Sequence, residues 1–190
     1  MKKQILKVGF DLDGVLLYNP TRIARPLIVL IKKIFFNKEV DKFHIPKTKM
    51  QQLIWSLLHK SSMFVSPGYA EIKKLVKCKK IEAYIVTARY EFLKKDFEKW
   101  VIKMEANKYF KGMFINNKDE QPYEFKKRLI RNLGLNIFIE DNWDIVKKIS
   151  IKNNGVKVFW ITNLFDIRKK YKYKFYNLQK AVEKLGQFQE

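Results

Sequence analysis

Short apolar runs rich in β-forming residues alternate with segments of helical spacing along most of this 190-residue chain. The predicted strands are Ile5–Phe10, Ala83–Val86, Met113–Ile115, the residues around Phe138, and Lys157–Ile161. The predicted helices are Tyr69–Lys77, Tyr90–Glu105, Pro122–Leu133, Trp143–Ile149 and Asn177–Leu185. Strands that alternate with helices form a parallel sheet covered on both faces. The sequence therefore predicts an α/β fold, a Rossmann-like doubly wound parallel sheet of about five strands.

Residues 18–66 do not follow this alternation. Within them, Ile23–Phe36 and Lys49–Leu58 have helical spacing, and Ser66-Pro67-Gly68 marks a return to the alternating pattern. We therefore expect a helical insertion at 18–66, placed after the first strand. The core domain would then consist of residues 1–17 and 67–190.

The chain is strongly basic, with 40 Lys and Arg against 19 Asp and Glu, a formal net charge of +21. Such a surface concentrates anionic ligands, so phosphorylated metabolites and nucleic acid both fit as partners. Lysine rather than arginine dominates the basic residues, which is also compatible with a solvated surface that binds nothing specific.

The cellular setting is constrained by three absences in the sequence. No apolar run reaches the ~20 residues of a membrane span. The apolar run near the start is interrupted by Lys7 and Asp11, so it is too short for the core of a signal peptide. A basic amphipathic helix such as 23–36 can lie on a membrane, but an apolar stripe more often packs on its own domain. A single cysteine, Cys78, cannot form an internal disulfide. We expect a cytoplasmic protein without a membrane partner.

The first predicted strand runs into Asp11-Leu12-Asp13-Gly14. Two carboxylates at the mouth of a buried strand are costly unless a cation lies beside them, and a divalent metal is the obvious one. Gly14 allows a sharp turn that aims backbone amides at an anion. A calcium-binding loop is excluded, because glycine comes fourth and Val15 occupies the fifth position, where such a loop needs an oxygen ligand.

Thr87-Ala88-Arg89 follows the second apolar strand of the core. A hydroxyl at the carboxyl end of a parallel strand can bind a ligand in the crevice where open α/β sheets hold their substrates. Thr87 could equally cap a helix that begins near Tyr90. Taken alone, the motif leaves both interpretations open.

A third group of polar residues, Glu140, Asp141 and Asp144, follows the strand around Phe138. One acid would be enough to cap the next helix. Three acids exceed that need and suit a magnesium site lined by oxygen ligands. The sequence does not decide which of the three completes such a site.

A lysine in the preceding helix is predicted to point toward these acids. The buried face of that helix is defined by Phe125, Leu129, Ile130 and Leu133. At 100° per residue Lys126 falls inside this arc, whereas Lys127 falls outside it. In a right-handed crossover the helix begins at the carboxyl edge of the sheet, so Lys126 would lie near the acids. The alternative is a lysine whose stem is buried and whose ammonium reaches solvent.

The order of these motifs, strand-DxDGV, strand-TAR, inward lysine and strand-ED, resembles the haloacid dehalogenase-like (HAD-like) phosphohydrolase superfamily from Ile5 to the last helix. The resemblance implies Asp11 as nucleophile and Asp13 as general acid and base. It implies phosphate binding by Thr87 and Lys126, and Gly14, Ala88 and Arg89 are further candidates for contacts with the phosphate or substrate. It also implies Mg²⁺ bound by Asp11, the Asp13 carbonyl and Asp141. Glu140 stands where many members have glycine or aspartate, so Glu140 and Asp144 stay supporting candidates for the metal site. Residues 18–66 would be the small helical cap of that superfamily.

The TAR tripeptide and the compact insertion are most similar to the 5′-nucleotidase and deoxyribonucleotidase branch of that superfamily. We therefore expect a magnesium-dependent phosphomonoester hydrolase that acts through an aspartyl phosphate on nucleoside monophosphates or another small phosphorylated metabolite. Asp13 would need a raised pKa to donate a proton. Two alternatives stay open: a polynucleotide 3′-phosphatase, and a noncatalytic protein that binds phosphate or nucleotides.

Overall fold

The computed structural model describes residues 5–20, 43, 45–60, 62–152, 155–163 and 166–188. A six-stranded sheet with every neighbouring pair parallel forms its centre, in the order β5-β4-β1-β6-β7-β8. Its strands are β1 (Leu6–Phe10), β4 (Ile81–Tyr90), β5 (Phe110–Asn116), β6 (Ile137–Glu140), β7 (Lys157–Ile161) and β8 (Lys174–Phe175). The predicted doubly wound α/β fold is confirmed, with β8 as a sixth strand that the sequence did not predict.

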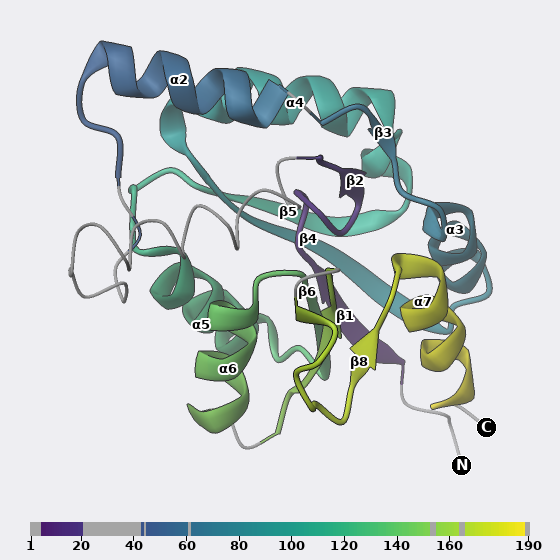
Figure 1. Ribbon diagram of the computed structural model, residues 1–190. Helices are drawn as coiled ribbons and strands as arrows, with labels where there is room; N and C mark the ends of the chain where they lie inside the picture. Colours follow the sequence, from purple (N-terminus) through teal and green to yellow (C-terminus); the bar gives the residue numbers. More distant parts are fainter. Residues whose placement is uncertain are drawn as a thin grey trace.

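Helices cover both faces of this sheet (Figure 1). They are α3 (Tyr69–Lys77), α4 (Lys94–Lys103), α5 (Pro122–Leu133), α6 (Trp143–Lys152) and α7 (Leu178–Gln187), with 3₁₀ turns η1 (Glu91–Leu93) and η2 (Ala106–Lys108). Within β4, Ala83 and Ile85 pack in the core beneath α3, α4 and α7, while Tyr84 and Val86 pack in the core beneath α5 and α6. This alternation is the period of two expected for a strand buried on both faces.

One predicted helix boundary is wrong. Residue Tyr90 belongs to β4 rather than to the following helix, and a register shift against β5 lies between Thr87 and Tyr90. A 3₁₀ turn then precedes α4. The extended end of β4 carries Arg89 beyond the regular strand pairing, which matters for the site below.

The described part of the insertion contains α2 (Lys49–Lys60), flanked by an antiparallel pair of two-residue strands, β2 (Leu17–Tyr18) and β3 (Phe64–Val65). The predicted second helix of the insertion is therefore present. The predicted helix at 23–36 lies outside the described residues. The division into a core domain and a cap at 18–66 stays a prediction.

The half-buried residues of α2 are mostly polar, with Trp55 among them, and four of its apolar side chains face solvent. Gln51, Gln52 and His59 are half-buried. The apolar side chains spaced along the other side are largely exposed: Met50, Leu53, Ile54 and Leu57. Within the described residues, no helix has the length and apolar character needed to cross a bilayer.

Two contacts hold the ends of the segment that contains α2. The backbone N–H of Phe43 donates to Gln121 Oε1 at 2.9 Å, and Gln121 Nε2 donates back to the Phe43 carbonyl at 3.1 Å. At the other end, Gly68 adopts φ 99° before α3, and a Cβ there would lie 2.7 Å from the Gln179 nitrogen in α7. Only glycine fits this conformation and this close approach.

Candidate active site

The three central strands deliver polar residues to one edge of the sheet. Because β4, β1 and β6 are adjacent and parallel, their carboxyl ends meet there. Asp11 follows β1, and its backbone N–H donates to the Ile139 carbonyl of β6 at 3.0 Å. This bond fixes the start of the loop after β1 against the strand that ends in Glu140.

The loop after β1 turns sharply at Gly14, which has φ 82°. Its N–H donates to the Leu17 carbonyl at 2.8 Å, and the Leu17 N–H donates to the Leu12 carbonyl at 2.8 Å. A residue with a Cβ disfavours this backbone conformation. The turn separates the Asp11 and Asp13 side chains into two different surroundings.

Lys126 lies on the buried face of α5, where the helical wheel predicts it, and is 2% exposed. Its Nζ is 2.9 Å from Asp11 Oδ1 and 2.7 Å from Glu140 Oε2. Burial alone would lower the pKa of Lys126, but the two carboxylates outweigh it and raise that pKa. The ammonium is therefore held charged between the two acids.

The cost of burying the charge is offset less well for Asp11 than for Lys126. Desolvation raises the pKa of Asp11 from 3.8 to about 7, opposed by Lys126 and reinforced by the nearby Glu140. Glu140 is fully buried, and burial raises its pKa as well. One ammonium shared by two buried carboxylates leaves an excess of negative charge at this edge of the sheet.

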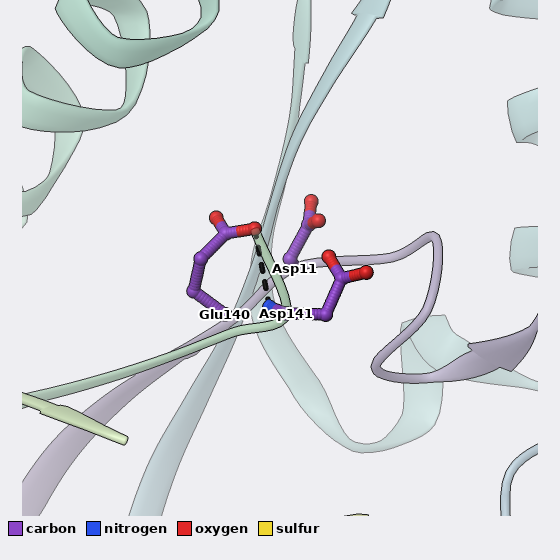
Figure 2. Close-up of side chains that lie close together, drawn as sticks. All are labelled: Asp11, Glu140 and Asp141. Carbon is purple, nitrogen blue, oxygen red and sulfur yellow. Dashed lines mark hydrogen bonds between the residues drawn. The ribbon is translucent and has the colours of Figure 1, made fainter. Parts of the chain in front are cut away.

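Asp141 adds a third carboxylate to this excess (Figure 2). Ligand oxygens of Asp11, Glu140 and Asp141 all lie within 4.8 Å of one another. The donor set consists of hard oxygen ligands, and the charge that Lys126 leaves uncompensated has the sign and size that a divalent cation would neutralise. Both observations fit Mg²⁺, which is commonly held by one or two carboxylates together with water.

The structure separates the three candidate acids that follow β6. Glu140 Oε2 is paired with Lys126, and its Oε1 accepts the backbone N–H groups of Asp141 at 3.2 Å and Asn142 at 3.0 Å. Both Glu140 oxygens thus accept hydrogen bonds from protein donors, and Glu140 belongs with Asp11 and Asp141 to the group of acids that could hold a metal. Asp144 is exposed and lies outside the acidic group.

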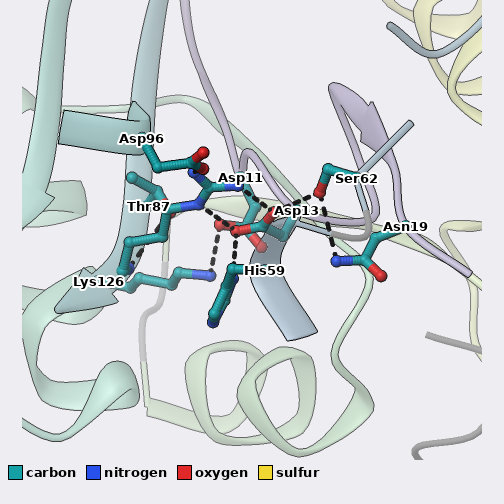
Figure 3. A network of polar contacts seen from close by, with 9 residues as sticks. Asp11, Asp13, Asn19, His59, Ser62, Thr87, Asp96 and Lys126 are labelled. Atoms are coloured by element: carbon teal, nitrogen blue, oxygen red, sulfur yellow. Dashed lines mark hydrogen bonds and ion pairs between the residues drawn. The ribbon is translucent and has the colours of Figure 1, made fainter. Parts of the chain in front are cut away.

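Asp13 has a different set of neighbours (Figure 3). Arg89 Nε donates to Asp13 Oδ2 and Arg89 Nη2 to Asp13 Oδ1, both at 2.7 Å. Arg89 Nη1 also pairs with Asp96 in the first turn of α4. Ser62 Oγ donates to Asp13 Oδ1 at 3.1 Å, and His59 Nδ1 lies 3.3 Å from Oδ2.

The expectation of a raised pKa for Asp13 is wrong for this arrangement. Burial would raise the pKa of Asp13, but the Arg89 guanidinium, assisted by His59, holds it well below 3.8. A bidentate pair with arginine stabilises the ionised carboxylate strongly. The sequence did not reveal this partner, because Arg89 lies 76 positions away and was interpreted as a phosphate ligand.

The remaining residues of the TAR motif line the same edge. Thr87 is buried, and its Oγ1 accepts the Arg89 backbone N–H at 3.3 Å. Ala88 is half-buried against the core beneath α5 and α6. Thr87 thus supports the bulged end of β4 that carries Arg89.

Three site residues were missed by the sequence analysis: His59, Ser62 and Asp96. His59 and Ser62 belong to the insertion, whose folded position no local pattern predicts. Asp96 reads as an ordinary acid in the first turn of a helix. The one available signal was Arg89 itself, since a buried arginine requires carboxylate partners.

Comparison with solved structures identifies proteins that share this fold. A HAD-superfamily hydrolase from Ehrlichia chaffeensis has a TM-score of 0.53 at 16% identity, with 98% of each chain covered. CbbY from Rhodobacter sphaeroides in complex with xylulose-(1,5)bisphosphate has a TM-score of 0.61 at 12% identity, covering 93% of this chain and 96% of that one. YfnB from Bacillus subtilis, solved bound to magnesium, has a TM-score of 0.59 at 15% identity, covering 97% and 100%.

Sequence comparison adds nothing to this result: no protein-family model matches the chain, and no curated protein sequence matches it. At 12–16% identity the structural likeness establishes a shared fold with HAD-type hydrolases. It does not single out the nucleotidase branch.

Proposed function

We propose that this chain is a phosphomonoester hydrolase in which Asp11 becomes phosphorylated. The observation that carries the proposal is the position of the Asp11 carboxylate. It lies at the carboxyl end of the central strand, 2.9 Å from the Lys126 ammonium and within 4.8 Å of two further acids. A nucleophilic carboxylate beside fixed positive charge is what attack on an anionic phosphate requires.

In the first step an Asp11 carboxylate oxygen attacks phosphorus and forms the new P–O bond. The bond from phosphorus to the leaving oxygen breaks, and its electron pair stays on that oxygen, which takes a proton from Asp13. Lys126 lowers the repulsion between the attacking carboxylate and the phosphoryl oxygens. Water then attacks the phosphorylated Asp11 with Asp13 as base, which releases inorganic phosphate and restores both carboxyl groups.

A divalent cation is part of the proposal. Asp11 and Asp141 would hold Mg²⁺, together with the backbone carbonyl of Asp13 that the HAD-like resemblance implies. Bound there, Mg²⁺ supplies positive charge to phosphoryl oxygens and favours the ionised form of Asp11. Glu140 would contribute chiefly by holding Lys126, because its Oε2 accepts a hydrogen bond from the Lys126 ammonium at 2.7 Å.

Asp13 must acquire a proton before the first step, and Arg89 opposes this. The guanidinium donates to both Asp13 oxygens and has no acceptor atom for a carboxyl proton, so it stabilises the ionised carboxylate much more strongly than the protonated form. A phosphoryl group offers oxygens with the same bidentate geometry. We infer that the incoming phosphate takes over Arg89 donors from Asp13, and that Arg89 thereby acts as a phosphate-binding residue.

The proposed substrates are small phosphorylated metabolites. Nucleoside monophosphates follow from the resemblance of the TAR motif to nucleotidases. Sugar phosphates join the panel because CbbY, which shares the fold, was solved with a sugar bisphosphate. The basic composition makes an oligonucleotide with a 3′-phosphate a useful further probe.

The test is phosphate release from this panel by the purified protein with Mg²⁺. We expect turnover of at least one substrate, loss of turnover with EDTA, and recovery on adding Mg²⁺. Asp11→Asn should lower kcat by about 10³-fold or more, because asparagine cannot form the acyl phosphate. Glu124→Gln, an exposed acid of α5, serves as the charge-matched control. An active Asp11→Asn protein would refute the proposal.

A further inference from the structure

We propose that His59 and Ser62 are positioning residues that aim the Asp13 carboxyl group at the leaving oxygen of the substrate. The inference rests on the proposed function and extends it to the inserted segment. It assigns to the end of α2 a role in the reaction itself. His59 lies in the last turn of α2, and Ser62 lies between α2 and β3.

The two Asp13 oxygens have matched surroundings. Each accepts one hydrogen bond from Arg89 in the core domain, at 2.7 Å. Each also faces one group from the insertion, Ser62 Oγ at 3.1 Å from Oδ1 and His59 Nδ1 at 3.3 Å from Oδ2. The carboxylate plane is thus held from two sides by two separate parts of the chain.

The insertion side is supported by its own contacts. Asn19, which follows β2, donates from Nδ2 to Ser62 Oγ at 3.3 Å. Asn19 and Ser62 are both buried, so this bond is shielded from water. The two chain segments that bound the insertion therefore meet at the group that touches Asp13.

His59 lies close to Asp13 but does not form a hydrogen bond with it. Its Nδ1 is within ion-pair distance of Asp13 Oδ2. The atom is buried, and among the described residues no acceptor or donor has hydrogen-bond geometry with it. His59 Nδ1 therefore lies within reach of Asp13 while none of its contacts with another described residue uses it as a hydrogen-bond partner.

Arg89 differs from Ser62 and His59 in the hydrogen bonds that it can form with Asp13. Arginine can only donate, so its bonds to Asp13 weaken once the carboxyl group is protonated and has lost its charge. The Ser62 hydroxyl can donate or accept, and a neutral imidazole can present either a donor or an acceptor at Nδ1. Ser62 and His59 can therefore keep Asp13 in place in the form that protonates the leaving oxygen, after Arg89 has turned to the phosphate.

The experiment compares substrates that need this proton with substrates that do not. An alkyl phosphate has a poor leaving group and requires protonation, whereas p-nitrophenyl phosphate expels a stable anion. Both yield the same phosphorylated Asp11, so later steps are common to both. The ratio of kcat/KM values for the two substrates then isolates the first chemical step.

For His59→Ala and Ser62→Ala we expect kcat/KM to fall about 10- to 100-fold on the alkyl phosphate and less than about 3-fold on p-nitrophenyl phosphate. Two conservative variants should restore much of the ratio: Ser62→Thr keeps the hydroxyl, and His59→Asn places a side-chain N–H near the position of Nδ1. Leu57→Ala, in the same turn of α2 and 60% exposed, is the control and should leave the ratio unchanged.

The outcomes separate the two proposals. An equal loss on both substrates, or no loss, would mean that His59 and Ser62 only stabilise the fold, and the positioning role would be wrong. Thermal unfolding of each variant identifies a stability loss directly. If wild-type protein hydrolyses neither substrate, or if Asp11→Asn matches wild type, the phosphatase proposal fails and the positioning role fails with it.

Discussion

Asp11 and Asp13 stand two positions apart on one loop, yet their surroundings have opposite electrical effects. Asp11 shares one ammonium with Glu140, and burial raises its pKa to about 7. Asp13 accepts two hydrogen bonds from the Arg89 guanidinium, which also pairs with Asp96, and its pKa is held well below 3.8 despite burial. Each cation is thus shared with a second carboxylate, and the difference lies in the remaining neighbours and in the number of donors: Glu140 raises the pKa of Asp11, whereas two Arg89 hydrogen bonds and His59 lower the pKa of Asp13.

The different pKa values of Asp11 and Asp13 originate outside the loop that carries them. The loop sequence presents the two acids, but their partners come from elements far along the chain, Lys126 from α5 and Arg89 from β4. Each partner reaches its acid because α5 starts, and β4 ends, at the carboxyl edge of the sheet. Replacing Lys126 or Arg89 one at a time should therefore change the electrostatic surroundings of one acid while leaving those of the other largely intact.

The largest effect is expected at Lys126. Lys126→Met would leave Asp11 and Glu140 buried without their shared cation, which typically costs about 3 to 5 kcal/mol. Chemical denaturation at neutral pH without metal measures the loss. Adding Glu140→Gln in the same chain should recover part of this stability but no phosphatase activity. A single variant as stable as wild type would show that the ammonium is not needed to balance the two acids.

Arg89 is expected to give the next largest effect. Arg89→Met should destabilise the protein by about 2 to 4 kcal/mol at pH 7, because Asp13 and Asp96 lose a buried partner. A folded pKa below the unfolded value contributes stability above about pH 4, and this stability disappears as pH falls through the folded pKa. The deficit should therefore shrink toward pH 3.

The matched control for that variant is Arg128→Met. Arg128 also forms an ion pair, with Glu120, but its side chain is 46% exposed. Exposed pairs contribute about 0 to 1 kcal/mol. Equal losses in the two arginine variants would contradict the claim that Asp13 is stabilised by a buried guanidinium.

The smallest effect, and one of opposite sign, is expected for Asp11→Asn without metal. Since the folded pKa of Asp11 lies above its unfolded value, the ionised form costs stability that grows as pH rises from about 4 to about 7. The variant should thus be more stable than wild type at pH 8 by on the order of 2 kcal/mol, and nearly equal at about pH 4, close to the unfolded pKa. Saturating Mg²⁺ should reverse the order, because wild type gains the binding energy. Denaturation curves at both pH values, with and without Mg²⁺, decide it.

The sequence predicted the scaffold of the site better than its electrostatics. Hydrophobic periodicity located α3 and α5 at their observed bounds, and the helical wheel placed Lys126 on the inner face. These features depend on local spacing, which burial on one face enforces. The sequence did not predict β8, because a strand of two residues, Lys174 and Phe175, is too short to show a hydrophobic period.

What failed depends on partners that no spacing reveals. The pKa of Asp13 is set by Arg89, which reaches it only because β4 continues past Thr87 through an irregular register. Of the three acids that follow β6, the structure brings Glu140 and Asp141 close to Asp11, whereas Asp144 is exposed and lies outside this group. Tertiary contacts of this kind are not encoded in neighbouring positions.

The hydrogen bonds between Phe43 and Gln121 join the chain before α2 to the residue that precedes α5. After α2, Gly68 lies so close to α7 that a Cβ there would be 2.7 Å from the Gln179 nitrogen. The segment that contains α2 is therefore attached on both sides to helices that pack on the sheet. Since one of these helices carries Lys126, Gln121 is a direct structural link between this segment and the helix that supplies the ammonium beside Asp11.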